Sequence, residues 1–320
     1  MTVVFYDQTK VSVSDDESVL DGLLKNNINV NYGCKNGVCQ SCMMQATDGT
    51  IPNQAQKGLT EMQIKQGYFL ACQCHPTEEL FISSEEVGQP LIDGVVVSKE
   101  LLSPSIIQLK IKADLDFQPG QFVNLKNSQG IMRSYSIASL PEEGILEFHI
   151  KHIQDGAFSH WVKESLNVND TLQLQGPQGE CYLKTKDNNT PLLLAAMNTG
   201  LAPVLGILKQ ALSSNHTGPI SLFIGAKDLS GHYLLDEVAE LSEQNENVQL
   251  HRVCLEGSSS DSNIKEADIY QTIKEELSST KDHQVYLCGA ESFVKKLKKQ
   301  CFLAGANMSD IFADAFVAAS

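Results

Sequence analysis

The sequence has 320 residues, of which 42% are hydrophobic and 20% are charged, as in an ordinary soluble globular protein of two or three domains. Its formal net charge of −15 argues against a nucleic-acid-binding scaffold, which needs a basic face. No apolar run approaches the length of a membrane span, and the N-terminal stretch "MTVVFYDQTKVSV" lacks the features of a signal peptide. We therefore expect a cytoplasmic protein with no membrane span and no nucleic-acid partner.

The first 87 residues have the pattern of a small unit of strands and one helix. Residues 2–6 and 11–13 predict two strands around a turn, and "ESVLDGLLKNN" at 17–27 has apolar residues at helical spacing. A further strand is predicted in "ELFISS" at 79–84. The stretch "EEVGQPLIDG", with Gly88 and Pro90, is typical of a linker.

The rest of the chain divides into two patterns. Between 92 and 187, six short strands separated by Pro-Gly and Gly-Pro turn signals predict an antiparallel barrel, interrupted by a helix in "AFSHWVKESL". From 188 to 320, four apolar strands alternate with amphipathic helices, which predicts βαβ units on a parallel sheet. We therefore expect three domains.

Three cysteines lie within nine residues in "YGCKNGVCQSC" at 32–42, and a fourth follows 30 residues after the third. The four, Cys34, Cys39, Cys42 and Cys72, have the C-x4-C-x2-C…C spacing of plant-type [2Fe–2S] ferredoxins. The two glycines in the loop permit the tight turns that bring three sulfurs to one cluster. The spacing predicts a [2Fe–2S] cluster bound by these four thiolates.

Two other uses of these thiols remain open on spacing alone. Structural zinc prefers two C-x2-C pairs, and only Cys39 and Cys42 form such a pair, whereas Cys72 and Cys74 are separated by one residue. Nine cysteines is an odd number for a disulfide framework. We favour the cluster and interpret Cys74 as a buried neighbour of the ligands.

Residues 1–87 resemble a plant-type ferredoxin domain, and residues 92–320 resemble the ferredoxin–NADP reductase superfamily. The fused order resembles the NADH-dependent reductase components of bacterial multicomponent oxygenases. The resemblance implies an α+β ferredoxin domain of the β-grasp type at 1–87, an antiparallel β-barrel flavin domain at 92–187 and an α/β parallel-sheet nucleotide-binding domain at 188–320. It implies a [2Fe–2S] cluster, FAD and NADH as cofactors.

Two segments carry the flavin part of the resemblance. In "RSYSIAS" at 133–139, Arg133 would pair with the FAD pyrophosphate, Tyr135 would lie along the flavin and Ser136 would lie near flavin N5. The segment "HIKHIQDGAFSHW" at 149–161 matches the family's second flavin segment, and the residues assigned to FAD there are His149, Ile150, Gly156, Ala157 and Ser159. His149 could instead be a surface residue of its strand.

Near the C-terminus, "IFADAF" at 311–316 resembles the family's closing segment, whose aromatic residue covers the flavin. Phe316 is the expected residue and Phe312 the alternative. The segment "VYLCGAESFV" at 285–294 would bring Cys288 and Gly289 beside the nicotinamide. Cys288 could instead be a buried strand thiol.

The nicotinamide part of the resemblance continues in the family's T-G-x-A-P pattern, present here with Thr199, Gly200 and Pro203 at a turn from strand to helix. The family usually has two glycines before the threonine, where this chain has Met197–Asn198. The residues that determine coenzyme choice are expected after the next strand, where Lys227 is the one basic residue and an aspartate follows. This favours NADH over NADPH.

The resemblance implies an NADH-dependent iron–sulfur flavoprotein reductase that passes electrons from NADH to FAD, to the cluster and on to a terminal oxygenase. Ser136 and Cys288 would position the cofactors, and no side chain need act as an acid or base. Alternatives are the same chain of cofactors serving another acceptor, such as a dehydratase of deoxysugar biosynthesis, or a redox-sensing module with weak NADH turnover. Gly37, Val38 and Gln40 are the loop residues that a partner protein would touch.

Overall fold

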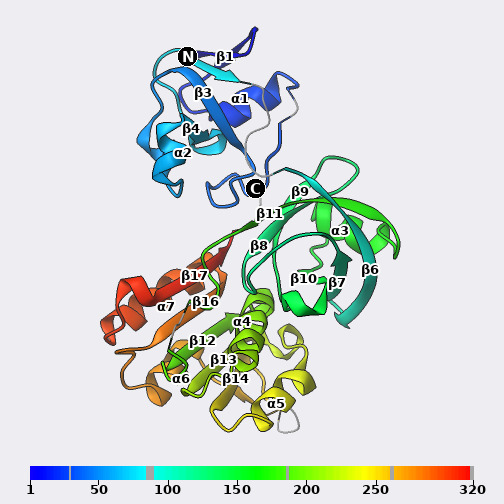
Figure 1. Cartoon of the computed structure of the whole chain (residues 1–320), viewed down its shortest axis with the longest axis vertical. Helices are drawn as coiled ribbons and strands as arrows, with labels where there is room; N and C mark the ends of the chain where they lie inside the picture. Colours follow the sequence, from blue (N-terminus) through cyan, green and yellow to red (C-terminus); the bar gives the residue numbers. More distant parts are fainter. Residues whose placement is uncertain (29, 84–89, 185–186, 260–262, 318–320) are drawn as a thin grey trace.

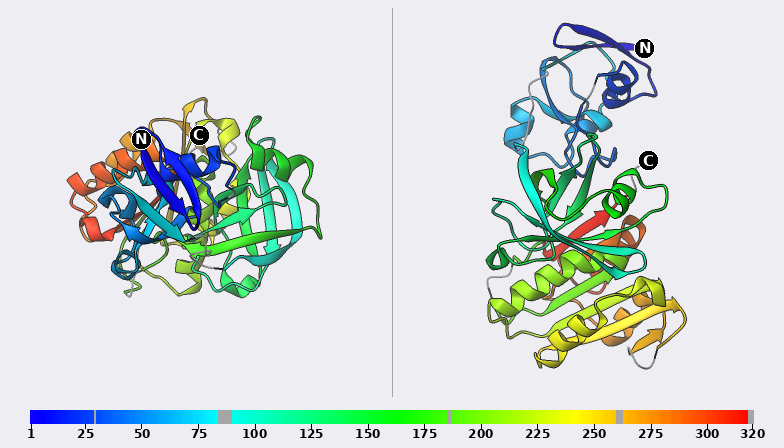
Figure 2. Two further views of the ribbon diagram at one scale, coloured as in Figure 1. Left: turned by 90° about the horizontal axis from the view of Figure 1, so that it is seen from above. Right: turned by 90° about the vertical axis from the view of Figure 1, so that its right-hand side faces the viewer.

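We describe the protein from a computed structural model, which defines residues 1–28, 30–83, 90–184, 187–259 and 263–317. These residues form three sheets that follow one another along an elongated molecule, with the N-terminal sheet at one end (Figures 1 and 2). Each sheet lies within one of the three predicted domains, whose boundaries stay predictions; the first, at residue 87, lies outside the described residues. In the described part, no helix is long and apolar enough to cross a membrane.

The N-terminal sheet has five strands in the order β2-β1-β5-β3-β4. They are β1 (Thr2–Tyr6), β2 (Thr9–Val13), β3 (Met43–Gly49), β4 (Tyr68–Leu70) and β5 (Leu80–Ser83). β1 and β2 form the predicted hairpin, and β5 pairs with β1 in parallel. Helix α1 (Val19–Lys25) begins after Ser18, whose hydroxyl accepts a hydrogen bond from the Asp21 N–H, and it packs its apolar face on the sheet. A second short helix, α2 (Glu61–Lys65), precedes β4.

The middle sheet contains the six predicted strands, all antiparallel, in the order β10-β7-β6-β11-β8-β9. They are β6 (Ile92–Ser103), β7 (Ile106–Lys112), β8 (Phe122–Lys126), β9 (Met132–Ser136), β10 (Leu146–Lys151) and β11 (Thr171–Gln178), and α3 (Ala157–Glu164) follows β10. The barrel closes just beyond β9, where the Ala138 N–H donates to the Glu147 carbonyl at 2.9 Å. The last strand, β11, passes through the Gly176–Pro177 turn signal with an irregularity of register and ends at Gln178.

The C-terminal sheet is parallel and has the order β15-β14-β13-β12-β16-β17. Its strands are β12 (Leu192–Met197), β13 (Ile220–Asp228), β14 (Val248–Glu256), β15 (Ile264–Glu266), β16 (Gln284–Ala290) and β17 (Ile311–Phe316). The helices are α4 (Leu201–Ser213), α5 (Leu235–Glu243), α6 (Ile269–Glu276) and α7 (Glu291–Leu303). The sequence predicted the four inner strands and all four helices but missed the edge strands β15 and β17. The predicted multidomain fold class is confirmed.

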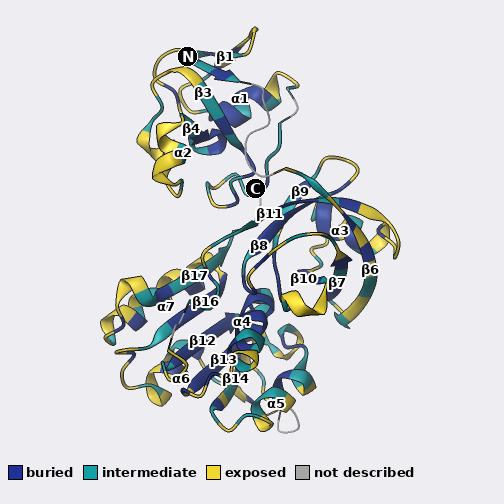
Figure 3. Ribbon diagram, viewed as in Figure 1, coloured by how far each residue is buried: buried dark blue, intermediate teal, exposed yellow. Residues whose placement is uncertain are grey.

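Burial follows these three sheets (Figure 3). The N-terminal domain and the barrel each have one apolar core, and the parallel sheet has one on each face. One of these two faces includes Ile106 of the barrel and Cys181, which follows the last barrel strand. The barrel and the parallel sheet are therefore joined by continuous apolar packing.

The turn between β12 and α4 depends on two backbone positions. Asn198 adopts a left-handed conformation with φ of 52°, which asparagine tolerates better than most residues other than glycine. Gly200 lies against the end of β16, where an added Cβ would be 2.0 Å from the Cys288 carbonyl oxygen. Asn198 therefore allows the same turn as the glycine that the family usually has before the threonine. Gly200 lets this turn lie close to the end of β16.

We predict that Gly200→Ala destabilises the C-terminal domain by about 1–3 kcal/mol, because two stretches of backbone must separate to admit the methyl group. Thermal unfolding followed by circular dichroism would measure the loss. Gly130→Ala is the comparison: an added Cβ meets nothing within 4 Å, and only the left-handed backbone, with φ of 81°, is unfavourable. Equal losses for the two variants would contradict the steric argument.

Candidate functional site

Three of the four predicted ligand cysteines lie in the loop between α1 and β3, and the fourth lies in a 3-10 turn after β4 (η2, Ala71–Gln73). The loop is tightly turned, because Lys35, Gly37 and Gln40 adopt left-handed conformations with φ of 56°, 76° and 54°. Only one of these three is a glycine, so the loop keeps two residues in a conformation that side chains disfavour. The fold therefore holds a specific loop geometry here.

Hydrogen-bond donors point at two sulfurs of this loop. The backbone N–H groups of Asn36 and Cys39 donate to Cys34 Sγ at 3.3 and 3.4 Å. The Cys34 N–H and the Ser41 hydroxyl donate to Cys39 Sγ at 3.3 and 3.2 Å. Donors placed in this way stabilise negative charge on sulfur, as thiolate ligands require.

The four thiols form two pairs. The hydrogen bond with Cys39 lowers the pKa of Cys34 to about 5, and the same bond together with burial raises the pKa of Cys39. In the same way the bond with Cys42 lowers the pKa of Cys72 to about 7, while that of Cys42 is raised. Two pairs fit a cluster whose two irons take two thiolates each. Among the described residues, no group of three or more His, Cys, Asp or Glu side chains is arranged to hold a single metal ion.

Cys74 has a different environment from the four paired thiols. Its side chain is 0% exposed, belongs to the apolar core of the N-terminal domain, and has a pKa raised to about 12 by burial. This agrees with the interpretation of Cys74 as a buried neighbour of the ligands.

A cavity of about 650 Å³ lies where the cysteine loop, the barrel and the parallel sheet meet. The cysteine loop contributes Gly33, Cys34, Val38 and Cys39. The barrel domain contributes residues that include Phe122, Arg133, Tyr135, Ser136, His149, Gly156, Ala157 and Ser159. The C-terminal domain contributes Thr199 and Ala202, from the turn after β12 and from α4, and Asp314 and Phe316 of β17. All the residues predicted to contact FAD line this cavity except Ile150, whose side chain is fully buried in the barrel core.

The barrel side of the cavity supplies positive charge and backbone donors. Arg133 lines the cavity, and its Nη1 donates to the Met132 carbonyl at 2.7 Å. Residues 156–159, the start of α3, also line it, so the amino end of a helix faces the cavity. The Ser159 hydroxyl accepts a hydrogen bond from the Ile153 N–H at 3.1 Å, which holds the preceding loop in place. A helix amino end and a guanidinium are suited to a pyrophosphate.

A partly buried hydroxyl–carboxyl pair crosses from the barrel to the parallel sheet. Ser136 Oγ donates to Asp314 Oδ2 at 2.6 Å. Burial raises the pKa of Asp314 to about 6, and the hydrogen bond from Ser136 opposes that rise. The sequence reasoning overlooked Asp314; the signal was a single acid within the otherwise apolar "IFADAF". This is the residue that connects the predicted flavin motif to β17.

The two aromatic candidates of β17 lie in different places. Phe316 lines the cavity. Phe312 stacks on Tyr286 with ring centroids 5.2 Å apart and packs against a core of the parallel sheet. Phe316 therefore borders the space to which the predicted flavin residues belong, and Phe312 does not.

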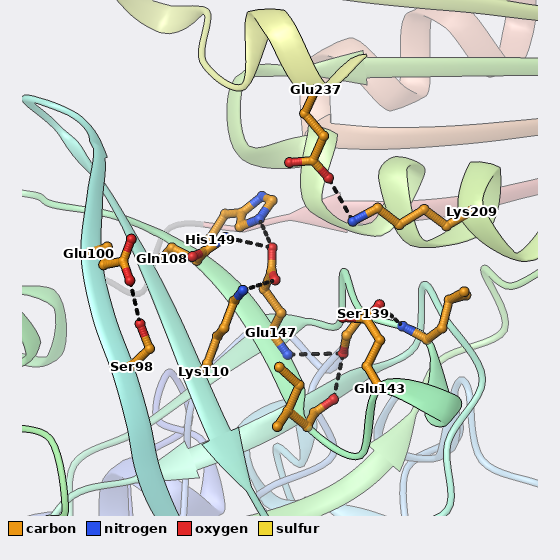
Figure 4. Close-up of polar contacts among 12 residues, drawn as sticks. Ser98, Glu100, Gln108, Lys110, Ser139, Glu143, Glu147, His149, Lys209 and Glu237 are labelled. Atoms are coloured by element: carbon orange, nitrogen blue, oxygen red, sulfur yellow. Dashed lines mark hydrogen bonds and ion pairs between the residues drawn. The ribbon is translucent and has the colours of Figure 1, made fainter. Parts of the chain in front are cut away.

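His149 is buried, so the alternative that it is a surface residue is wrong. Its Nε2 donates to Glu147 Oε1 at 2.9 Å (Figure 4). Its Nδ1 is 3.0 Å from the hydroxyl of Tyr233, which comes from the C-terminal domain. Burial would raise the pKa of Glu147, but His149 and Lys110 lower it to about 2. The carboxylate therefore stays ionised and keeps the imidazole oriented toward Tyr233.

The predicted nicotinamide residues surround the turn after β12. Thr199 lines the cavity, whereas Gly200 and Pro203 are buried behind it at the start of α4. Cys288 is fully buried, with its Sγ 3.6 Å from that of Cys181. Gly289 has φ of 143° and lies so close to Met197 that an added Cβ would be 2.8 Å from the Met197 Cβ.

At the end of β13, the base predicted to influence coenzyme choice is paired with an acid. Lys227 Nζ lies 3.8 Å from Glu256 Oε1, and both side chains are exposed. Asp228 accepts hydrogen bonds from the Ser230 N–H and hydroxyl, which lower its pKa. Two carboxylates therefore accompany the one base at this strand end.

Comparison with protein families identifies each part of the chain. Residues 4–77 match a 2Fe-2S iron-sulfur cluster binding domain, residues 93–182 match an oxidoreductase FAD-binding domain, and residues 194–299 match an oxidoreductase NAD-binding domain. The cysteine loop falls within the first match, the barrel wall of the cavity within the second, and β13 to β16 of the parallel sheet within the third. β17, with Asp314 and Phe316, lies beyond the third match. The protein accordingly binds a [2Fe–2S] cluster, FAD and NADH.

Relatives are similar over nearly the whole length. The ferredoxin–NAD(P)+ reductase component of a naphthalene 1,2-dioxygenase system from Pseudomonas putida is 31% identical over 96% of this chain and 95% of its own. A CDP-6-deoxy-L-threo-D-glycero-4-hexulose-3-dehydrase reductase from Yersinia pestis is 26% identical over 96% of this chain and 95% of its own.

Solved structures share the fold. An Amycolatopsis cytochrome P450 reductase superposes with a TM-score of 0.71 at 23% identity over 100% of both chains. A ferredoxin reductase of carbazole 1,9a-dioxygenase superposes with a TM-score of 0.67 at 24% identity over 98% of both chains. Together with the paired thiols and the shared cavity, the 31% identity over nearly the full length establishes that this chain belongs to the NAD-dependent iron–sulfur flavoprotein reductases that serve as electron-transfer components of oxygenase systems.

Proposed function

We propose that this protein is the reductase component of a multicomponent oxygenase and delivers electrons from NADH to a separate terminal oxygenase. The observation that carries the proposal is the shared cavity, which is lined by Cys34 and Cys39, by the flavin motif of β9 and by Thr199 of the nucleotide turn. Residues predicted for three cofactors thus border one space. This supports a path that begins at the nicotinamide turn and ends at the cysteine loop.

FAD, when bound, accepts a hydride from NADH and hands on electrons singly, and the cluster carries them one at a time. The protein supplies the geometry. We assign the pyrophosphate of FAD to Arg133 and the amino end of α3, which lie on one wall of the cavity. Phe316 would cover one face of the flavin and Ser136 would lie beside its reacting edge, held by Asp314.

We assign the cluster to Cys34, Cys39, Cys42 and Cys72. The support is that the thiols influence one another in two pairs, with one pKa lowered and the other raised in each, and that N–H and hydroxyl donors point at the first pair. Such donors stabilise the extra negative charge of a reduced cluster and so affect its potential.

We assign the nicotinamide site to Thr199, Gly200, Pro203, Cys288 and Gly289, with Lys227 at the edge that reads the ribose. The left-handed Asn198 keeps the turn compact, which supports ordinary NADH turnover over the redox-sensing alternative. Glu256 beside Lys227 disfavours an additional phosphate, so NADH is preferred over NADPH.

A deoxysugar dehydratase is the alternative electron acceptor. One observation favours it, the similarity to the Yersinia pestis dehydrase reductase over 96% of this chain. The chain would then use the same cofactors to supply electrons to a deoxysugar dehydratase. Capture of the acceptor from the native cells and its identification by mass spectrometry separates the two. We further propose a cytoplasmic location, because all nine cysteines are free thiols, and no nucleic-acid partner, because the net charge is −15.

For the proposed function, the first prediction compares two neighbouring thiols. In Cys72→Ser the cluster loses a ligand, so its absorption disappears and NADH-dependent cytochrome c reduction falls by roughly tenfold or more, while ferricyanide reduction at the flavin persists. Cys74→Ser keeps the cluster and both activities. If Cys74→Ser alone lost the cluster, the ligand assignment would be wrong. If the loaded wild-type protein oxidised NADH with neither acceptor, the proposed function would be wrong.

The second prediction concerns Asp314, whose pKa is raised to about 6. Above that pH its carboxylate accepts the Ser136 hydrogen bond, and below it the carboxyl is neutral. We expect the rate of flavin reduction by NADH, measured by stopped flow, to change with an inflection near pH 6. Asp314→Asn still accepts from Ser136 and does not titrate, so its profile should lack the inflection.

The same shift affects stability. The pKa of Asp314 in the folded protein lies above the ordinary value of 3.8, so ionisation of this carboxyl destabilises the fold. The stability contributed by the neutral carboxyl is fully present below about pH 4 and is lost as the pH rises through about 6. Asp314→Asn should therefore unfold at a higher temperature relative to wild type at pH 7 than at pH 4. If the rate of flavin reduction in Asp314→Asn still showed an inflection near pH 6, the assignment of that inflection to Asp314 would be refuted.

The third prediction concerns coenzyme choice. Glu256→Lys places a second base beside Lys227 and should raise kcat/KM for NADPH by roughly tenfold, since a charge-assisted contact to a phosphate is worth about 1.5–3 kcal/mol. Steady-state kinetics with both coenzymes measures it. Glu275→Lys makes the same charge change on the exposed face of α6 and should leave the ratio unchanged. Equal effects of the two variants would show that net charge alone acts.

A further inference from the structure

Asn124 is a fully buried amide in the middle of β8, with 0% of its surface exposed. Its neighbours along the strand, Val123 and Leu125, point into the apolar core of the barrel. Because strand side chains alternate, Asn124 points out of the barrel, on the same face as Phe122 and Lys126. It is buried because the cysteine loop of the N-terminal domain covers this face.

Both ends of the Asn124 amide are used. Nδ2 donates to the backbone carbonyl oxygen of Cys39 at 3.2 Å, and Oδ1 accepts from the Ser134 hydroxyl at 2.6 Å. Ser134 lies directly opposite on β9, one residue from Arg133 and Tyr135, and it lines the cavity. The amide therefore connects a predicted cluster ligand to the strand that carries the flavin motif.

The chemistry of the position argues that this connection is specific. A buried amide costs stability unless its donor and acceptor are both satisfied, and an apolar side chain would cover the loop equally well. The Cys39 N–H already donates to Cys34 Sγ, so Cys39 is fixed through its N–H by the loop and through its carbonyl by the barrel. Beside it, Lys126 Nζ donates to Asn31 Oδ1 at 3.1 Å, a second bond between the two domains.

We propose that Asn124 is a positioning residue that sets the distance and orientation of the cysteine loop relative to the flavin strand, and that it thereby controls electron transfer between them. Asn124 does not line the cavity and touches no substrate; it acts through Cys39 and Ser134. The inference rests on the proposed function, because it assigns the cluster to the loop and the flavin to the cavity.

The test uses Asn124→Asp in the holoprotein with both cofactors bound. The carboxylate keeps the acceptor for Ser134 but replaces the donor to the Cys39 carbonyl with an acceptor. In anaerobic stopped flow with NADH, we expect flavin reduction to change by less than about twofold and cluster reduction to slow by roughly tenfold, as a small displacement of reacting groups produces. Rates are normalised to the flavin and cluster content of each sample.

Asn127→Asp is the matched control. Asn127 is also a buried asparagine at the end of the β8–β9 hairpin, but its Oδ1 accepts only from the N–H groups of Gln129 and Ile131 within the turn. It should leave both rates unchanged. A wild-type protein whose flavin is not reduced by NADH would refute the proposed function itself, whereas a wild-type protein that reduces both cofactors leaves the Asn124 comparison to decide the inference.

A second measurement does not depend on turnover. Hydrogen–deuterium exchange of the peptide covering residues 30–42 should be faster in Asn124→Asp than in wild type and unchanged in Asn127→Asp, because only the former frees the loop from the barrel. The proposal is overturned if Asn124→Asp slows flavin and cluster reduction equally or slows neither of them. It is also overturned if hydrogen exchange of residues 30–42 is unchanged in this variant. If Asn124→Asp does not retain its cluster, Lys126→Met is used in its place. This variant should show the same changes to a smaller degree. If its loop exchange and its rate of cluster reduction both equal those of the wild type, the proposal is overturned.

Discussion

The outward face of the β8–β9 hairpin is the surface on which the other parts of this molecule are arranged. Through Asn124 it contacts the cysteine loop of the N-terminal domain, and through Ser136 it contacts Asp314 of the parallel sheet. Arg133 of the same hairpin lines the cavity between them. Because side chains alternate along a strand, Val123 and Leu125 of β8 build the barrel core, while Asn124 on the opposite face meets the neighbouring domain.

The contacts at this junction are polar rather than only apolar. Ser136 with Asp314 and His149 with Tyr233 each join the barrel to the C-terminal domain; the first pair is partly buried and the second is fully buried. Apolar packing tolerates small shifts, whereas a buried hydrogen bond is strong only at one distance and angle. Such pairs suit a protein in which the separation of bound cofactors matters more than the stability of any one domain.

Local patterns in the sequence were sufficient for the barrel strands and for the inner strands of the parallel sheet, and they carry the prediction of the cysteine ligands. Strand alternation, helical periodicity and cysteine spacing all act over a few residues, so the barrel, the inner parallel strands and the C-x4-C-x2-C loop were predictable. Asp314, Asn124 and Tyr233 were not, because their partners lie 178, 85 and 84 residues away. The edge strand β17 was missed for a related reason: its short segment forms a strand only through pairing with β16.

The same geometry restricts where an acceptor protein can approach the cysteine loop. Gly37 adjoins the side chain of Gln73, and Gln40 donates to the Gly58 carbonyl, so both are engaged within the N-terminal domain. Val38 is 46% exposed and lies beside Cys34 on the cavity side, whereas Cys42 and Cys72 are buried in the domain core. Of the three loop residues, Val38 is therefore the one that an acceptor can touch without first displacing an internal contact.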